Sequence, residues 1–147
     1  MASDGEARQV VVVGVDGSPA SVAALSWAGH YGAATGAVVW ALHIWHYPTA
    51  GGLPPGITPE SVTDEVKANQ RKELDEAMST AYLDPAALVD SKVGYGHPAQ
   101  VLISESENAD LIVVGHRGHG GFTGMLTGSV TLHVVNHATC PVVVVRG

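Results

Sequence analysis

The sequence has a single cysteine, Cys140, among its 147 residues, so no intrachain disulfide can form. It also lacks long apolar stretches, and none approaches the roughly 20 residues that a membrane span needs. The first residues, MASDGEARQ, contain acidic side chains and no apolar core of a secretory signal. We therefore expect a cytoplasmic protein that does not enter the membrane.

Basic residues are scarce as well. There are 7 Lys and Arg against 14 Asp and Glu, which gives a formal net charge of −7. Binding to long nucleic acid normally requires a cationic surface, so we expect no nucleic-acid partner. A single small nucleotide is still allowed, because backbone N–H groups or a metal ion can offset the phosphate charge locally.

Several motifs of catalytic and nucleotide-binding proteins are missing. The absence of GxxxxGK[ST], and of GxGxxG after the first apolar run, disfavours a P-loop NTPase and a Rossmann dehydrogenase. The absence of HExxH and G-x-S-x-G removes two further enzyme classes. The pairs His116/His119 and His133/His137 have spacings that zinc could use, but we favour structural or surface roles for them. We therefore predict no catalytic residue.

Five short apolar runs predict five strands, at residues 9–15, 37–45, 88–93, 110–114 and 141–146. Helical patterns separate them. We expect these helices to begin at Ser18-Pro19, at Thr58-Pro59, at Pro98 and at Gly128 or Ser129. The alternation predicts an α/β fold: a doubly wound, open parallel five-stranded sheet of order 3-2-1-4-5 with helices on both faces. We assign residues 1–8 to a disordered tail and residues 9–147 to one domain.

Finer expectations concern three of the helices and one connecting segment. The first helix should end at Gly36, and the second should carry an apolar stripe of Val62, Val66, Leu74, Met78 and Ala81. The last helix should turn Val130, Val134 and Val135 to the interior. The segment from Tyr47 to Thr58 is rich in proline and glycine, which predicts a long exposed loop that is either a lid or a plain connector.

The most informative motif is GHRGHGGFTGMLTGS, which follows the apolar run 111–114. Gly115, Gly118, Gly128 and Ser129 are spaced G-x2-G-x9-G-S between a predicted strand and a predicted helix. Backbone without side chains can approach phosphate oxygens closely, and the free N–H groups of a helix start can bind them. The pattern predicts a site for an anionic ligand, which we interpret as a nucleotide, and a glycine-rich loop without a ligand is the alternative interpretation.

Topology brings a second segment to this loop. In the order 3-2-1-4-5 the crevice opens between Gly14-Val15-Asp16 and the loop that begins at Gly115. The Asp16 carboxylate could accept ribose hydroxyls or hold a metal ion that bridges phosphates, and its alternative role is that of a turn or cap residue. Ser129 could cap the last helix, bind a phosphate, or do both, and Arg117 could pair with phosphate or be solvated.

Three segments, VVVGVDGSPAS, ALHIWH and ADLIVVGHRGHGGFTGMLTGSVTLHVVNHATCPVVVVR, resemble the universal stress protein family of the ATP-binding, single-domain kind. The resemblance implies an adenine nucleotide alpha hydrolase-like fold with an adenine nucleotide between the first and fourth strands. The residues that match the family's ligand contacts are Gly14, Val15, Asp16, Ile44, Val114, Gly115, His116, Arg117, Gly118, Gly128, Ser129 and Val130. His116 and His119 depart from the family's usual smaller or basic residues.

The resemblance also implies a function and an assembly. We expect an ATP-binding protein, with or without Mg²⁺, that acts as a nucleotide-dependent sensor or switch in stress response and hydrolyses ATP slowly at most. The alternatives are a metal-dependent ATPase or adenylate-transferring enzyme that uses Asp16, and a dimeric interaction module that binds no nucleotide. The family commonly dimerises through its last strand, and an apolar edge at Val142 to Val145 supports the same assembly here.

Overall fold

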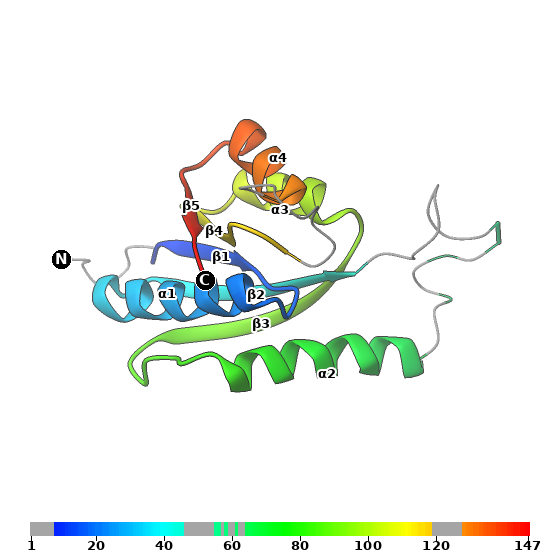
Figure 1. Ribbon diagram of the computed structural model, residues 1–147, viewed down its shortest axis with the longest axis horizontal. Coiled ribbons are helices and arrows are strands. Elements are labelled where there is room, and N and C mark those ends of the chain that lie inside the picture. The colour runs from blue at the N-terminus through cyan, green and yellow to red at the C-terminus, as the bar shows by residue number, and fades with distance from the viewer. Residues whose placement is uncertain (1–7, 46–54, 57, 59–60, 62–63, 119–127) are drawn as a thin grey trace.

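The computed structural model describes residues 8–45, 55, 56, 58, 61, 64–118 and 128–147, which contain one five-stranded parallel sheet. The strand order is β3-β2-β1-β4-β5, as the sequence predicts. Figure 1 shows the elements in space. In chain order they are β1 (Val10–Gly14), α1 (Pro19–Thr35), β2 (Val38–Trp45), α2 (Asp64–Thr80), β3 (Leu88–Tyr95), α3 (Pro98–Ser106), β4 (Leu111–Gly115), α4 (Ser129–His137) and β5 (Val142–Val145).

The sheet is the middle layer of three (Figure 1), with α1 and α2 on one face and α3 and α4 on the other. Side chains of a strand point alternately to the two faces. Val11 and Val13 of β1 belong to a buried cluster with residues of α1 and α2. Val12 belongs to a second buried cluster, with residues of α3 and α4. Burial on both faces explains why the central strands are continuous runs of valine and isoleucine.

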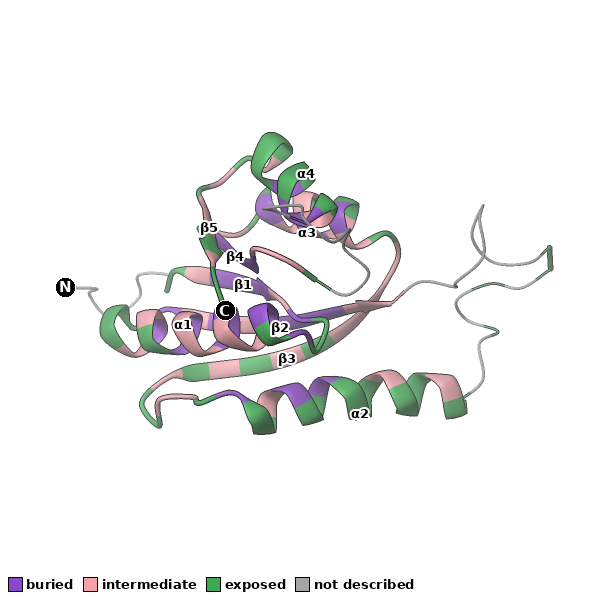
Figure 2. Cartoon of the chain, viewed as in Figure 1, coloured by how far each residue is buried: buried purple, intermediate pink, exposed green. Residues whose placement is uncertain are grey.

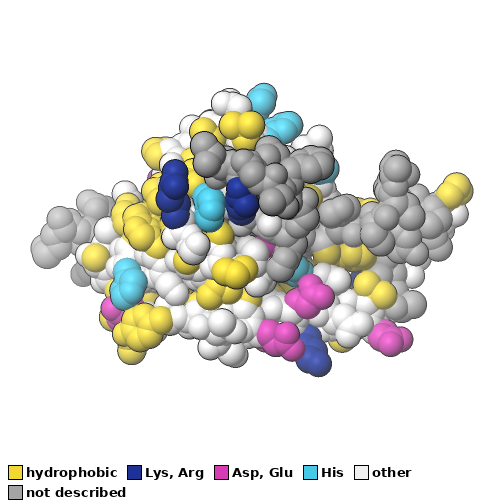
Figure 3. Space-filling model, viewed as in Figure 1, with side chains coloured by type: hydrophobic (Ala, Val, Ile, Leu, Met, Phe, Trp, Pro, Cys, Tyr) yellow, Lys and Arg dark blue, Asp and Glu magenta, His cyan; other side chains and the backbone are white. Residues whose placement is uncertain are grey.

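Burial falls off toward the edge of the sheet formed by β3 and toward α2 (Figure 2). Leu74 and Ala77 are the buried residues of α2, and its remaining described positions are partly or fully exposed. Arg71 and Asp75, one turn apart on α2, form an ion pair with an N–O distance of 3.1 Å. Figure 3 shows acidic side chains on this lower part of the molecule. The helix therefore covers the sheet with a narrow apolar stripe and presents charges to solvent.

Helix α1 begins and ends as its sequence predicts. Ser18 precedes the helix in an extended conformation, and its hydroxyl accepts the N–H of Ser21 at 3.3 Å. Gly36 ends the helix with a φ of +77°, the left-handed region that favours glycine, and its N–H donates to the carbonyl of Gly32 at 2.8 Å. The Ser18 cap places the start of α1 shortly after the carboxyl end of β1, and Gly36 sets where the helix ends.

The predicted start of the second helix is wrong, since α2 begins at Asp64 and not at Thr58-Pro59. Thr58 and Ser61 instead form hydrogen bonds with each other. The N–H of Thr58 donates to the Ser61 hydroxyl at 2.8 Å, and the N–H of Ser61 donates to the Thr58 carbonyl at 3.0 Å. A Thr-Pro pair can close such a local turn as readily as it starts a helix. Val62 and most of the predicted loop at 47–58 lie outside the described residues.

Helix α4 begins at Ser129, one of its two predicted starts, but differs from its prediction in two other respects. Gly128, with φ −66° and ψ 156°, is the N-cap, so Ser129 does not have the capping role that the sequence suggested. Val134 is fully buried, but Val135 is 47% exposed, which contradicts its predicted interior position. Consecutive helical residues are 100° apart, and the inward positions belong to Thr131 and Val134, three residues apart. The hydroxyl of Thr131 thus occupies a position that the apolar pattern assigned to valine.

Within the described ranges, no helix combines the length and the apolar character needed to cross a membrane.

Candidate functional site

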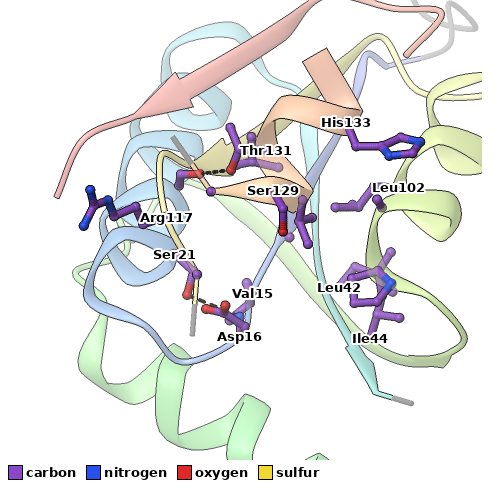
Figure 4. Close-up of a pocket in the computed structure, with 18 of the residues that line it drawn as sticks. Val15, Asp16, Ser21, Leu42, Ile44, Leu102, Arg117, Ser129, Thr131 and His133 are labelled. Carbon is purple, nitrogen blue, oxygen red and sulfur yellow. Dashed lines mark hydrogen bonds between the residues drawn. The ribbon is translucent and has the colours of Figure 1, made fainter. Parts of the chain in front are cut away.

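A cavity of about 510 Å³ opens at the carboxyl ends of β1 and β4. These strands pair directly, although α1, β2, α2, β3 and α3 separate them along the chain. The winding of the sheet reverses between them, and ligands of open α/β sheets bind at such a point. The starts of α3 and α4 complete the wall of the cavity (Figure 4). The predicted crevice between the two chain segments is therefore confirmed.

Most of the residues predicted for the site lie on this wall. His116 is the exception, because its backbone frames the site without lining the cavity. Its N–H donates to the carbonyl of Val145 at 2.8 Å, and its carbonyl accepts the N–H of Gly128 at 2.6 Å. The predicted residues that line the cavity are Gly14, Val15, Asp16, Ile44, Val114, Gly115, Arg117, Gly118, Gly128, Ser129 and Val130.

The end of β1 is held from β2. The N–H of Val15 donates to the carbonyl of Leu42 at 2.9 Å. The carbonyl of Val15 lies 2.9 Å from Nδ1 of His43, which must be the donor because a carbonyl oxygen only accepts. His43 is itself buried, and its Nε2 lies 2.8 Å from Oε1 of Gln70 in α2. The backbone that precedes Asp16 is therefore held by β2 and, through His43 and Gln70, is linked to α2.

Asp16 is a turn residue and also part of the cavity wall. Its Oδ1 accepts the N–H of Ser18 at 2.9 Å and the Ser18 hydroxyl at 2.5 Å. Its own N–H donates to the hydroxyl of Ser21 at 3.2 Å. These bonds confirm the turn interpretation of the sequence VDGSP. The same side chain lines the cavity, so the structural role orients the carboxylate toward the space where a ligand would bind (Figure 4).

The glycines of the motif differ in how much room they have for a side chain. A Cβ on Gly115 would lie 2.6 Å from the backbone carbon of Ala20 in α1, so this position permits the close approach of α1 to β4. A Cβ on Gly118 would collide with Oδ2 of Asp16. A Cβ on Gly128 would lie 3.3 Å from Cα of Arg117, which is tight but tolerable. The first glycine thus serves packing, while the second leaves room for the Asp16 carboxylate.

The sequence pattern misses several residues of the wall. Leu42, Ala99 and Leu102 provide apolar surface beside Ile44, and His97 and Pro98 lie at the start of α3. His133 lies one turn after Ser129 and therefore shares its face of α4. The missed signals are the parallel topology, which brings the start of α3 to this edge of the sheet, and the four-residue spacing from Ser129. The wall residues that were not predicted are Ser21, Leu42, His97, Pro98, Ala99, Leu102, Thr131 and His133.

Side chains that could form a metal centre by themselves are not grouped in the described residues. No cluster of three or more His, Cys, Asp or Glu occurs there. His133 and His137 have ring centroids 4.6 Å apart, and His119 lies outside the described residues. The Cys140 side chain packs against the second buried cluster, which contains residues of α3 and α4. Burial raises the pKa of its thiol, so the thiol stays protonated near neutral pH.

A model of the Universal stress protein family matches residues 7–146. The chain belongs to this family. Among curated relatives, a universal stress protein of Mycolicibacterium smegmatis is 40% identical over 142 residues, which cover 96% of this chain and 47% of the relative. A universal stress protein of Mycobacterium tuberculosis is 36% identical over 138 residues, which cover 92% of this chain and 44% of the relative. The chain spans about half the length of the curated relatives it matches.

Solved structures of the family share the fold. The universal stress protein UspA from Lactobacillus plantarum is similar with a TM-score of 0.71 at 26% identity, covering 96% of this chain and all of that one. A universal stress protein solved in complex with cAMP is similar with a TM-score of 0.61 at 27% identity, covering 95% of this chain and 98% of that one. The sheet order and the flanking helices are those of the adenine nucleotide alpha hydrolase-like fold.

Proposed function

We propose that this universal stress protein binds ATP in the cavity at the ends of β1 and β4, and acts in the cytoplasm as a nucleotide-dependent sensor or switch in stress response. The observation that carries the proposal is the glycine frame. Gly118 lies against the Asp16 carboxylate, and Gly128 N-caps α4 at the cavity wall. A helix start without a side chain at its cap is suited to phosphate oxygens.

The shape of the wall supports an order for the parts of the nucleotide. Apolar side chains of Leu42, Ile44 and Leu102 would contact the base, and Asp16 lies between them and the glycine loop (Figure 4). The carboxylate would then accept hydroxyls of the ribose, and the start of α4 with Arg117 would face the phosphates. The cavity volume of about 510 Å³ falls within the usual range for ligand sites.

The comparison structure that contains cAMP supports an adenine nucleotide as the ligand class. We propose ATP itself because the wall offers two separate phosphate-binding features, the start of α4 and the loop around Arg117 and Gly118. Mg²⁺ would bind through the phosphates, with Asp16 as the one acidic side chain that the described wall provides. A ligand in contact with both the β1 loop and α4 would link the positions of these two segments. Nucleotide binding could then change the conformation of the protein, as a switch requires.

We further propose that two copies pair through β5. This strand is the edge of the sheet next to β4, and Val144 is 40% exposed. An edge strand has unpaired backbone groups on its outer side, and pairing with a second copy satisfies them across a two-fold axis. The exposed valine edge would be covered in the same step.

Two experiments test the proposal together. Freshly purified protein is denatured and the released small molecules are identified by mass spectrometry, and nucleotide-free protein is titrated with ATP by calorimetry. We expect ATP among the released molecules or a measurable ATP affinity. Absence of both would favour the interaction module that binds no nucleotide. Fast, magnesium-dependent turnover, above roughly one per second as in ordinary enzymes, would favour the enzyme instead.

A further inference from the structure

The peptide group that joins Val15 to Asp16 is held from both of its ends. Its carbonyl oxygen accepts a hydrogen bond from Nδ1 of His43 in β2 at 2.9 Å. Its N–H donates to the hydroxyl of Ser21 in α1 at 3.2 Å (Figure 4). A trans peptide group is planar, and its carbonyl and N–H point in opposite directions. The two bonds therefore constrain the orientation of this plane, and with it the direction in which the Asp16 side chain leaves the backbone.

The ring of His43 is held from a second side by α2. Its side chain lies on the same face of the sheet as Ala41, the face that α1 and α2 cover, and it is only 6% exposed. Nε2 of the ring lies 2.8 Å from Oε1 of Gln70 and 3.4 Å from Oε2 of Glu73. Both partners belong to α2. The position of the ring against Val15 therefore depends on where α2 lies.

Helix α2 itself is attached to the rest of the fold by few buried contacts. Leu74 and Ala77 are its buried residues. A polar contact at a distance from the cavity is the bond from Arg71 to the hydroxyl of Ser91 in β3, at 2.6 Å. A helix with little buried apolar surface opens locally at a low cost in free energy. A bond from such a helix to a residue that orients the cavity wall makes the wall depend on the docking of the helix.

We propose that His43 is a positioning residue for Asp16, and that Gln70 makes the docking of α2 and the binding of nucleotide depend on each other. The proposal rests on the proposed nucleotide site and adds its regulation. Neither His43 nor Gln70 belongs to the described cavity wall, so both act through the peptide group that precedes Asp16. Such coupling is reciprocal: a bound nucleotide favours the docked helix, and the docked helix favours the nucleotide. A partner that displaces α2 would thereby release nucleotide.

The test uses Gln70→Met, which removes the hydrogen bond to His43 and keeps a straight side chain of similar helix propensity. The matched control is Ser91→Ala. It removes another hydrogen bond between α2 and the sheet, at a residue that does not belong to the described cavity wall. His43→Leu removes both bonds of the ring. If this buried variant does not fold, Gln70→Met at a partly exposed position still decides the question.

The first measurement is ATP affinity by calorimetry, with each variant alone and combined with Asp16→Ala. We expect Gln70→Met to lower the affinity about fivefold, the effect of one ordinary hydrogen bond. Ser91→Ala should leave the affinity within about twofold, and so should Gln70→Met in the Asp16→Ala background, because independent effects would add and this one acts through Asp16. An unchanged affinity in Gln70→Met, or an equal loss in both backgrounds, would overturn the inference.

The second measurement is amide hydrogen exchange by NMR, which also tests the link in the absence of nucleotide. In the free protein, the N–H of Asp16 should exchange faster in Gln70→Met than in the wild type or Ser91→Ala. ATP should slow exchange in α2 of the wild type, and this effect should be lost in Gln70→Met. Unchanged exchange at Asp16 in Gln70→Met would overturn the inference. Absence of ATP binding by the wild type, with faster exchange at Asp16 in Gln70→Met, would overturn the proposed function and support the link.

Discussion

The hydroxyl of Thr131 donates a 2.6 Å hydrogen bond to the carbonyl of Gly115, which joins the first turn of α4 to the end of β4. Thr131 is only 3% exposed. The bond spans the two ends of the glycine loop and keeps the helix start facing the crevice. A valine would fill the same volume but would leave a buried carbonyl without its donor.

We predict that Thr131→Val lowers the free energy of unfolding by about 1–3 kcal/mol, the usual cost of a buried group left unsatisfied. The matched control is Thr80→Val, because Thr80 donates a similar bond to the carbonyl of Glu76 at 2.9 Å on the exposed surface of α2. Its effect should stay within about 0.5 kcal/mol. Urea denaturation of both variants measures the free energy of unfolding. An equal decrease in the two variants would show that the buried hydrogen bond contributes no more to stability than the exposed one.

Gly115 gives a second prediction about stability. Gly115→Ala should destabilise the fold by about 1–3 kcal/mol, because the new Cβ would lie 2.6 Å from the backbone of Ala20 and neither chain segment can yield cheaply. Gly94→Ala is the control, since a Cβ there would make an ordinary contact of 3.6 Å with Leu42. Thermal unfolding compares the pair. A Gly115→Ala protein as stable as Gly94→Ala would mean that α1 and β4 pack less tightly than described.

These glycines show where sequence reasoning succeeds and where it ends. The spacing of the motif predicts a loop at a strand end, and the strand order predicts its neighbour, the β1 loop. The pattern alone cannot assign a separate reason to each glycine, because the approach of Ala20 to Gly115 arises from helix packing between distant segments. His97 and His133 are missed for the same reason: their place on the wall follows from the mutual packing of α3 and α4.

The helix boundaries likewise include some that the sequence predicts and some that it does not. Ser18 and Gly36 delimit α1 as expected because their caps are local to the chain. The predicted helix start at Thr58-Pro59 differs from the start of α2 at Asp64, and Thr58 and Ser61 hydrogen-bond to each other; residues 62 and 63 lie outside the described residues. Val135 fails as a core residue because apolar character does not reveal that Thr131 takes the inward position.

Asp16 distinguishes a switch from an enzyme. Asp16→Ala should weaken ATP binding by about 1–3 kcal/mol, the scale for losing a charged hydrogen-bond partner. With a ribose contact the loss should be nearly the same with and without Mg²⁺, whereas a metal role would make it depend on Mg²⁺. Asp16→Asn is the companion variant, because its amide oxygen can still accept the bonds from Ser18. Calorimetry at two Mg²⁺ concentrations gives the answer, and ATP turnover that collapses in Asp16→Ala would support the enzyme.

The dimer prediction concerns the outer edge of β5. The carbonyls of Pro141 and Val145 accept bonds from the side of β4, so by strand alternation the backbone groups of Val144 face outward. Val144→Pro removes an outward donor and should yield a monomer, while Val143→Pro would remove a donor toward β4 and damage the fold. Light scattering at micromolar concentration measures the mass. A wild-type monomer, or a Val144→Pro dimer, would contradict pairing through β5.

Gly128 offers the most direct test of ATP binding at the start of α4. This residue has an ordinary extended conformation, and an added Cβ would lie 3.3 Å from its nearest neighbour, so Gly128→Glu should fold. Its carboxylate would place bulk and negative charge at the start of α4, where we expect the phosphates. Calorimetric titration with ATP should show binding by the wild type and none by Gly128→Glu, with matching circular dichroism spectra. Equal ATP affinity of the two folded proteins would contradict the proposed site.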